Sequence, residues 1–207
     1  LEEVAAQLTE RLLAAVRGIV VREGAARGAG MGPVCGAKQK EDVLAYIERG
    51  RAEGARLLSG GGALTGGDYD RGCFIAPTVF DRVTPSMKSY QEEIFGPVLQ
   101  IARASDFDEA VALPSKHQYG NGVAIFTRDG DAARELASRV DVGMVGINVP
   151  IPVPLAYYSF GGWKRSAFGD MNQHGPDGVR FYTKVKTVTA RWPKGLRESS
   201  FVMPTMR

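Results

Sequence analysis

The stretch Gly122-Val123-Ala124-Ile125-Phe126-Thr127 decides the fold, together with the segment that follows it as far as Val149. Residues 122–127 are apolar and β-branched, which favours a strand, and residues 143–149 repeat that pattern. Residues 129–140 between them predict a helix. A strand, a helix and a second strand in this order are typical of neighbouring parallel strands joined by a crossover.

The same alternation extends upstream. Residues 98–102 predict a short buried strand, and residues 106–113 predict a helix with acidic residues at its start, which Pro114 should end or kink. Residues 73–83 favour a strand broken or edged at Pro77. We therefore expect an α/β fold, with a parallel sheet and flanking helices.

The N-terminal part predicts two helices and two glycine-rich segments. Val4, Leu8, Leu12, Val16 and Val20 recur at helical spacing and indicate an amphipathic helix. A second helix is expected over residues 40–54, ended by Gly54. The glycine-rich residues 24–32 and 60–67 are interpreted as a loop and a surface turn.

The composition of the chain restricts the kinds of function that it can have. The chain has 207 residues, 44% of them hydrophobic, which is enough for one large domain. A net charge of +3 without basic blocks makes nucleic acid an unexpected partner, and no apolar run is long enough to predict a membrane span. Cys35 and Cys73 lack metal-type spacing, and two thiols in a chain this long indicate a reducing, cytoplasmic location rather than a disulfide scaffold. The first residue is Leu1, which indicates a processed start or a piece of a longer protein.

The segment Glu92-Glu93-Ile94-Phe95-Gly96-Pro97-Val98 carries the candidate cofactor contacts. The carboxylate of Glu93 can accept hydrogen bonds from a vicinal diol, and the ring of Phe95 can pack on a planar heterocycle. Gly96 and Pro97 impose a rigid turn that would hold both side chains. On composition alone, a solvated glutamate beside a core phenylalanine is the alternative.

This segment resembles the nicotinamide-ribose contact loop of aldehyde dehydrogenases. Further matches to the same family occur in the same order, at residues 31–33, 72–79, 119–127 and 159–166. The resemblance implies that Glu93 binds the nicotinamide ribose, that Phe95 supports the nicotinamide ring, and that Phe160 lines the substrate tunnel. It also implies NAD as the cofactor and the fold of the family's catalytic domain.

The run Gly146-Ile147-Asn148-Val149-Pro150-Ile151-Pro152-Val153-Pro154-Leu155 is similar to a narrower branch, the CoA-acylating methylmalonate-semialdehyde (malonate-semialdehyde) dehydrogenases. Residues 168–170, 178–183 and 202–206 resemble the same branch. The resemblance implies a semialdehyde substrate, coenzyme A as co-substrate, and Asn148 in the substrate pocket. The alternating prolines form a stiff wall, and a plain packing loop is the alternative.

The catalytic residues of that family are not matched here. Its nucleophilic cysteine lies in a string like Gly-Gln-Arg-Cys-Met upstream of the first helix, and its cofactor domain also lies upstream. Cys35 and Cys73 are interpreted as structural residues, and His117 and His174 as surface or structural histidines without metal spacing. Lys164 is expected to be solvated. We therefore expect no catalytic residue, no metal site and no activity from the chain alone.

Two divisions of the chain are predicted. Residues 1–178 would form a partial catalytic domain, and residues 179–207 an oligomerisation strand and tail. Residues 180–190 alternate β-branched and polar side chains and predict a strand. The resemblance implies that this strand extends a sheet across a subunit interface, so a homo-oligomer is expected of the full-length enzyme. An edge strand protected by Lys184 and Lys186 is the alternative. The alternatives for function are a non-acylating NAD(P)-dependent aldehyde dehydrogenase and a truncated, non-catalytic interaction module.

Overall fold

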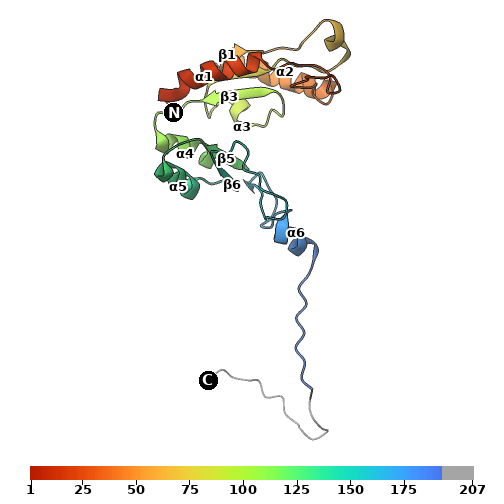
Figure 1. The fold of residues 1–207 in the computed structure, drawn as a ribbon, viewed down its shortest axis with the longest axis vertical. Coiled ribbons are helices and arrows are strands. Elements are labelled where there is room, and N and C mark those ends of the chain that lie inside the picture. Colours follow the sequence, from red (N-terminus) through yellow and green to blue (C-terminus); the bar gives the residue numbers. More distant parts are fainter. Residues whose placement is uncertain (193–207) are drawn as a thin grey trace.

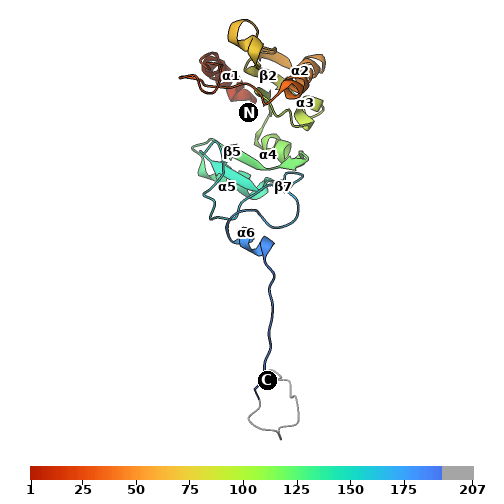
Figure 2. The ribbon, with the colours of Figure 1, turned by 90° about the vertical axis from the view of Figure 1, so that its right-hand side faces the viewer.

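The computed structural model describes residues 1–192, which form two stacked bodies and an extended arm. In Figure 1 the first body holds α1 to β3, the second holds α4 to α6, and the arm leaves the second body after α6. Figure 2, turned by a quarter, shows the same stacking, so the two bodies lie one above the other. Each body has its own buried apolar cluster.

The first body is a three-stranded sheet with helices packed on it. Its elements in chain order are α1 (Glu2–Arg17), α2 (Ala37–Ala52), β1 (Arg56–Ser59), the 3-10 helix η1 (Gly67–Arg71), β2 (Thr78–Val83), α3 (Lys88–Gln91) and β3 (Val98–Ala102). The strand order is β1-β2-β3, with β1 antiparallel and β3 parallel to the central β2. Val43 and Ile47 of α2 are fully buried against Phe80 of β2, which anchors the helix to the sheet.

The second body is built from two strand pairs and two helices. Its elements are α4 (Phe107–Lys116), β4 (Tyr119–Gly120), β5 (Gly122–Ile125), α5 (Gly130–Arg139), β6 (Met144–Ile147), β7 (Trp163–Lys164) and the terminal helix α6 (Gly175–Tyr182). β5 and β6 pair in parallel from Gly122 opposite Met144 to Ile125 opposite Ile147, and β4 pairs antiparallel with β7. The side chain of Asp129 caps α5 by accepting from two backbone N–H groups.

The α/β class is confirmed, but the expected single parallel sheet is corrected. The predicted parallel pair of residues 122–127 and 143–149 exists as β5–β6, whereas residues 98–102 form β3, which pairs in parallel with β2 in a separate sheet. Hydrophobic runs predict that strands exist, whereas the partner of each strand depends on tertiary contacts. The strand β1 lies between two regions that the sequence assigned to a helix and a turn, and it was not predicted.

Pro114 does not end its helix where expected. The helix α4 continues to Lys116 with Pro114 inside its last turn. A proline there removes only one hydrogen bond near the helix end, and Ser115 Oγ donates to the Val111 carbonyl 2.9 Å away. The predicted end is therefore two residues early, because the cost of a proline is smaller in the last turn than in a helix interior.

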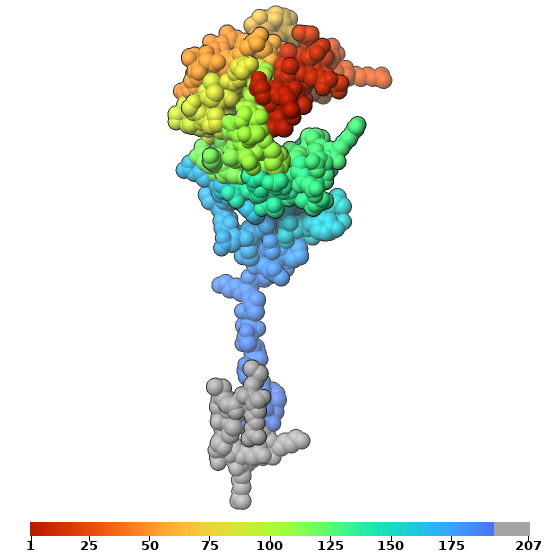
Figure 3. Space-filling model, turned by 90° about the vertical axis from the view of Figure 1, so that its left-hand side faces the viewer, coloured from red at the N-terminus to blue at the C-terminus, as the bar shows by residue number. Residues whose placement is uncertain are grey.

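The C-terminal segment differs in part from the predicted strand. Arg180 to Tyr182 lie in α6, and residues 183–192 run away from the second body as an extended arm with exposed side chains (Figure 3). The described residues contain no strand paired with this arm. The interface strand therefore stays a prediction, as does the division of the chain into residues 1–178 and 179–207. Residues 202–206 lie outside the described residues.

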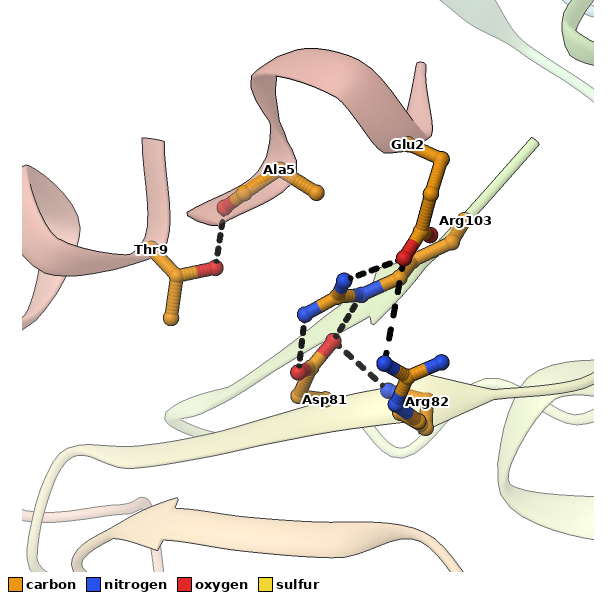
Figure 4. Close-up of polar contacts among 6 residues, drawn as sticks. All are labelled: Glu2, Ala5, Thr9, Asp81, Arg82 and Arg103. Atoms are coloured by element: carbon orange, nitrogen blue, oxygen red, sulfur yellow. Dashed lines mark hydrogen bonds and ion pairs between the residues drawn. The ribbon is translucent and has the colours of Figure 1, made fainter. Parts of the chain in front are cut away.

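An ion-pair network fixes α1 to the sheet (Figure 4). Asp81 of β2 is 2% exposed, and Arg103 donates to its two carboxylate oxygens over 2.9 and 2.6 Å. A third nitrogen of Arg103 lies 2.7 Å from Glu2 Oε1 at the start of α1. These hydrogen bonds lower the pKa of Asp81. The network explains why α1 stays docked although only Ala5 of this helix is buried.

The apolar stripe of α1 is largely uncovered. Leu8 is 56% exposed and Val4 is 49% exposed, so the predicted helix forms while its predicted apolar face contacts little. Among the described residues, none of the helices is long and apolar enough to cross a membrane.

Candidate functional site

The contact loop, residues 92–98, connects α3 to β3 and is anchored to the first body at Ile94, Gly96 and Pro97. Ile94 packs against the first apolar cluster, and a Cβ on Gly96 would lie 2.6 Å from a methyl carbon of Val43. Thr78 N donates to the Pro97 carbonyl over 2.9 Å, which joins the end of the loop to β2. Only glycine fits at position 96, because any larger residue would push the loop away from α2. The loop therefore presents Glu93, which precedes Ile94, and Phe95, which lies between Ile94 and Gly96, to solvent.

Phe95 adopts a conformation that non-glycine residues rarely use. Its φ is +52°, and its side chain is 75% exposed. A left-handed conformation costs an L-residue roughly 1–2 kcal/mol. The side-chain amide of Gln39 donates to the Phe95 carbonyl and supports this conformation from α2. Gln39 was missed from the sequence, since 56 residues separate it from Phe95.

The adjacent carboxylates Glu92 and Glu93 have opposite surroundings. Tyr46 donates to Glu92 Oε2 over 2.7 Å, while Lys88 and Arg49 lie 3.7 and 3.9 Å from that carboxylate. The Tyr46 hydrogen bond lowers the pKa of Glu92, and the same bond raises the pKa of Tyr46. Glu93 is exposed and makes no hydrogen bond or ion pair with residues 1–192. Its carboxylate therefore keeps its full capacity to accept hydrogen bonds from a ligand.

A shallow cavity of about 310 Å³ accompanies the loop. It is lined by Ser89, Tyr90, Glu92, Glu93, Ile94, Phe95, Gly96, Val98 and Gln100. A free carboxylate and an exposed ring beside one cavity fit a ribose diol and a flat heterocycle. The cavity is too open to enclose a ligand by itself, so it offers one wall of a site.

The predicted pocket residue Asn148 lies at the ends of β5 and β6, within a different body from Glu93. Its side-chain amide accepts from Thr127 N over 2.9 Å and donates to the Thr127 carbonyl over 3.0 Å. Its φ is +58°, which asparagine tolerates better than most residues. The amide thus fixes the turn into the proline-rich segment, a role that local sequence did not indicate.

Phe160, the second predicted pocket residue, is half-buried. Its ring stacks on the ring of His174, with centroids 4.5 Å apart and an interplanar angle of 7°. The segment that follows it packs closely on the start of β6, because a Cβ on Gly143 would lie 1.8 Å from the Gly161 carbonyl oxygen. The close approach of Gly143 and Gly161 therefore places Phe160 in the same body as Asn148.

Lys164 is exposed, as expected, and its side chain also makes specific contacts. Its ammonium group donates to the carbonyl oxygens of Pro114 and Ser115, each 3.0 Å away, at the C-terminal end of α4. A cation at this end of a helix is favourable because the last carbonyls carry partial negative charge. Lys164 thereby fastens β7 to α4, a contact across about 50 residues that the sequence did not reveal.

The remaining candidates have structural surroundings. His117 bonds two backbone groups, which confirms its structural interpretation. Cys35 is exposed and its thiol donates to the Gln39 side chain, while Cys73 is half-buried. Within residues 1–192, no group of three or more His, Cys, Asp or Glu side chains has the arrangement of a metal site.

The known proteins that are similar to this chain belong to one family. The model of the aldehyde dehydrogenase family matches residues 1–188. Malonate-semialdehyde dehydrogenase of Pseudomonas aeruginosa is 46% identical, over 99% of this chain and 42% of that protein. Malonate-semialdehyde dehydrogenase 1 of Geobacillus thermodenitrificans is 43% identical, over 92% of this chain and 39% of that protein.

A solved structure is similar over nearly the whole described chain. It is named as a methylmalonate-semialdehyde dehydrogenase from Sinorhizobium meliloti complexed with NAD, with a TM-score of 0.90 and 50% identity over 95% of this chain. The match covers 40% of that structure, so the chain spans about two fifths of the length of its relatives. Because the family model covers residues 1–188, the chain belongs to the aldehyde dehydrogenase family.

Proposed function

We propose that this chain supplies the nicotinamide-ribose half-site of an NAD-dependent, CoA-acylating aldehyde dehydrogenase. The proposed reaction of the whole enzyme oxidises malonate or methylmalonate semialdehyde, with coenzyme A, to an acyl-CoA and carbon dioxide. NAD, when bound, accepts the hydride. The contrast between Glu92 and Glu93 carries the proposal, since the first carboxylate is occupied by Tyr46 and the second is free.

The residues of the contact loop have distinct parts in this proposal. Glu93 accepts hydrogen bonds from the two ribose hydroxyls, and a charged acceptor makes such bonds stronger than a neutral one. Phe95 presents its exposed ring to the nicotinamide, in an orientation that Gln39 and Gly96 hold. Preorganisation of this kind reduces the ordering cost of binding.

The substrate side is assigned to the second body. Phe160 and Asn148 stay predicted pocket residues, with the proline-rich segment after Asn148 as a stiff wall. Asn148 would act chiefly by fixing the start of that wall, because its amide is already bonded to Thr127. The resemblance of the proline-rich segment and the names of the most similar relatives support the semialdehyde and coenzyme A assignments. We also propose a homo-oligomer through the arm, and a cytoplasmic location on the ground of two free thiols.

Nicotinamide mononucleotide tests the half-site in the 207-residue chain itself. This probe contains the ring and ribose but no adenosine, so it needs only the part of the site proposed here. Titration followed by ¹⁵N NMR should shift the amides of Glu93, Phe95 and Gly96. Glu93→Gln should weaken binding, whereas Glu10→Gln, the same change on the exposed face of α1, should not. A wild-type chain that leaves these amides unshifted would contradict the proposal.

The absence of a matched nucleophile gives a second test. The purified chain with NAD, malonate semialdehyde and coenzyme A should produce no NADH, while a chimera should restore turnover. In the chimera this chain replaces the segment that it matches in the Pseudomonas aeruginosa relative. An acyl-CoA product from the chimera supports the acylating assignment, and a free acid supports the non-acylating alternative.

A further inference from the structure

The short helix α3 ends immediately before the contact loop, and its last carbonyl groups are bonded from outside. A four-residue helix cannot satisfy these carbonyls internally. Three side chains donate to three successive carbonyls: Gln100 to Ser89 over 2.6 Å, His117 to Tyr90 over 2.9 Å, and Gln118 to Gln91 over 2.5 Å. Two of the three donors, His117 and Gln118, come from the link between α4 and β4, which belongs to the second body.

The contacts of His117 define its tautomer. The backbone N–H of Tyr119 can only donate, and it lies 3.1 Å from Nδ1, so Nδ1 is the acceptor. Nε2 therefore carries the proton and donates to the Tyr90 carbonyl. The imidazole also lies edge-on to the Tyr90 ring and against the Tyr119 ring, with centroids 5.1 and 5.7 Å away. The imidazole of His117 thus joins α3 to β4 through two hydrogen bonds and two ring contacts.

These bonds lie close to Glu93 along the chain. Tyr90 precedes Glu93 by three residues and Gln91 by two, while Glu92 is bonded to Tyr46 on the other side. The free carboxylate has no contact of its own, so its position depends on this tethered backbone. Downstream, the loop is anchored independently at Gly96.

We propose that His117 and Gln118 are positioning residues for the nicotinamide half-site. They hold the backbone before Glu93 at the distance from Phe95 that a ribose and its attached ring require. The second body thereby sets the geometry of a site that lies in the first. This inference rests on the proposed function of Glu93 and Phe95, and it assigns a role to residues that touch neither the ribose nor the ring.

The test uses variants of the 207-residue chain and the same nicotinamide mononucleotide titration. His117→Ala removes both hydrogen bonds of the imidazole, and Gln118→Ala removes the bond to the Gln91 carbonyl together with the one accepted from Arg165. His117→Gln places an amide nitrogen near the position of Nε2 and keeps a donor for the Tyr90 carbonyl. Gln7→Ala, an exposed change on α1, is the control. Thermal unfolding of each variant is measured in parallel, and titrations are run well below the unfolding midpoint.

We expect about a tenfold loss of affinity in His117→Ala and Gln118→Ala, because misplacing a charged acceptor sacrifices about one hydrogen bond's free energy. His117→Gln should recover most of that loss, and Gln7→Ala should bind like the wild type. Equal affinity of His117→Ala and wild type, with Glu93→Gln still weakened, would overturn this inference alone. So would a His117→Gln variant as weak as His117→Ala. If Glu93→Gln binds normally, the proposed function itself fails. Should His117→Ala not fold, Gln118→Ala and His117→Gln decide the matter.

Discussion

The buried ion pair between Asp81 and Arg103 gives the most quantitative prediction. Arg103→Met keeps much of the side chain's length and removes both hydrogen bonds to the Asp81 carboxylate. That carboxylate is 2% exposed, so water cannot replace the lost donors. Removing one partner of a buried pair costs about 3–5 kcal/mol, since the remaining charge stays buried without compensation.

The structure places this variant near the lower end of that range. The backbone N–H of Arg82 still donates to Asp81 Oδ1 over 2.8 Å, and the Arg103 side chain is 17% exposed rather than fully buried. We therefore expect a loss of about 3 kcal/mol in the free energy of unfolding. In a chain of this size, that loss corresponds to a fall of about 6–12 °C in the unfolding midpoint.

Urea unfolding followed by circular dichroism at pH 7 measures the effect. Arg11→Met, on the exposed side of α1, should change stability by less than about 0.5 kcal/mol. The double variant Asp81→Asn/Arg103→Met should be less destabilised than Arg103→Met, because no buried charge remains. If Arg103→Met and Arg11→Met are equally stable, the pair does not hold the sheet together and the reasoning is refuted.

The stabilisation that the Asp81–Arg103 pair contributes should depend on pH in a defined direction. Arg103 lowers the pKa of Asp81 below its ordinary value of 3.8, so the pair's stabilisation is present above pH 3.8. The stabilisation is lost as the pH falls through the lowered pKa of Asp81, where the carboxylate of the folded protein takes up a proton. The stability difference between wild type and Arg103→Met should therefore narrow below pH 3.8. A difference that stays constant from pH 7 to pH 2 would contradict this.

Three further predictions follow from single contacts. Gly96→Ala should lower the free energy of unfolding by about 1–3 kcal/mol and weaken nicotinamide mononucleotide binding, because its Cβ meets Val43. Asn148→Ala should cost about 1–3 kcal/mol in urea unfolding, with Asn148→Gly costing less because glycine accepts a positive φ. Tyr46→Phe should raise the pKa of Glu92 toward its ordinary 4.5, measured by ¹³C NMR, and an unchanged pKa would contradict the assigned hydrogen bond.

Local patterns predicted most of the elements, since periodicity and capping act over a few residues. The strand over residues 98–102 has the predicted bounds, and the helix predicted over residues 129–140 appears with Asp129 as its cap. Lys164 and Gln39 could not be assigned, because their partners lie about 50 residues away in sequence. The parallel pairs belong to separate sheets, which the sequence did not predict, because strand pairing also depends on contacts between residues that are distant in sequence.

The α1 helix shows where a correct local prediction does not describe the packing. Its apolar spacing gave the helix, yet Leu8 and Val4 are about half exposed. The ion pair from Glu2 to Arg103 supplies a docking contact that apolar periodicity cannot indicate. Amphipathic spacing predicts which face of a helix can be buried, whereas tertiary contacts determine whether that face is buried.

The adjacent glutamates show what the structure adds to the candidate site. Composition does not distinguish Glu92 from Glu93, and the resemblance alone favoured the second. The surroundings separate them on physical grounds, because Tyr46, Lys88 and Arg49 occupy the first carboxylate. An engaged glutamate would have to break these contacts before binding a diol, whereas Glu93 has none to break within the described residues. The free carboxylate is thus the stronger candidate for the ribose, and the tethers before it supply the rigidity that a single exposed side chain lacks.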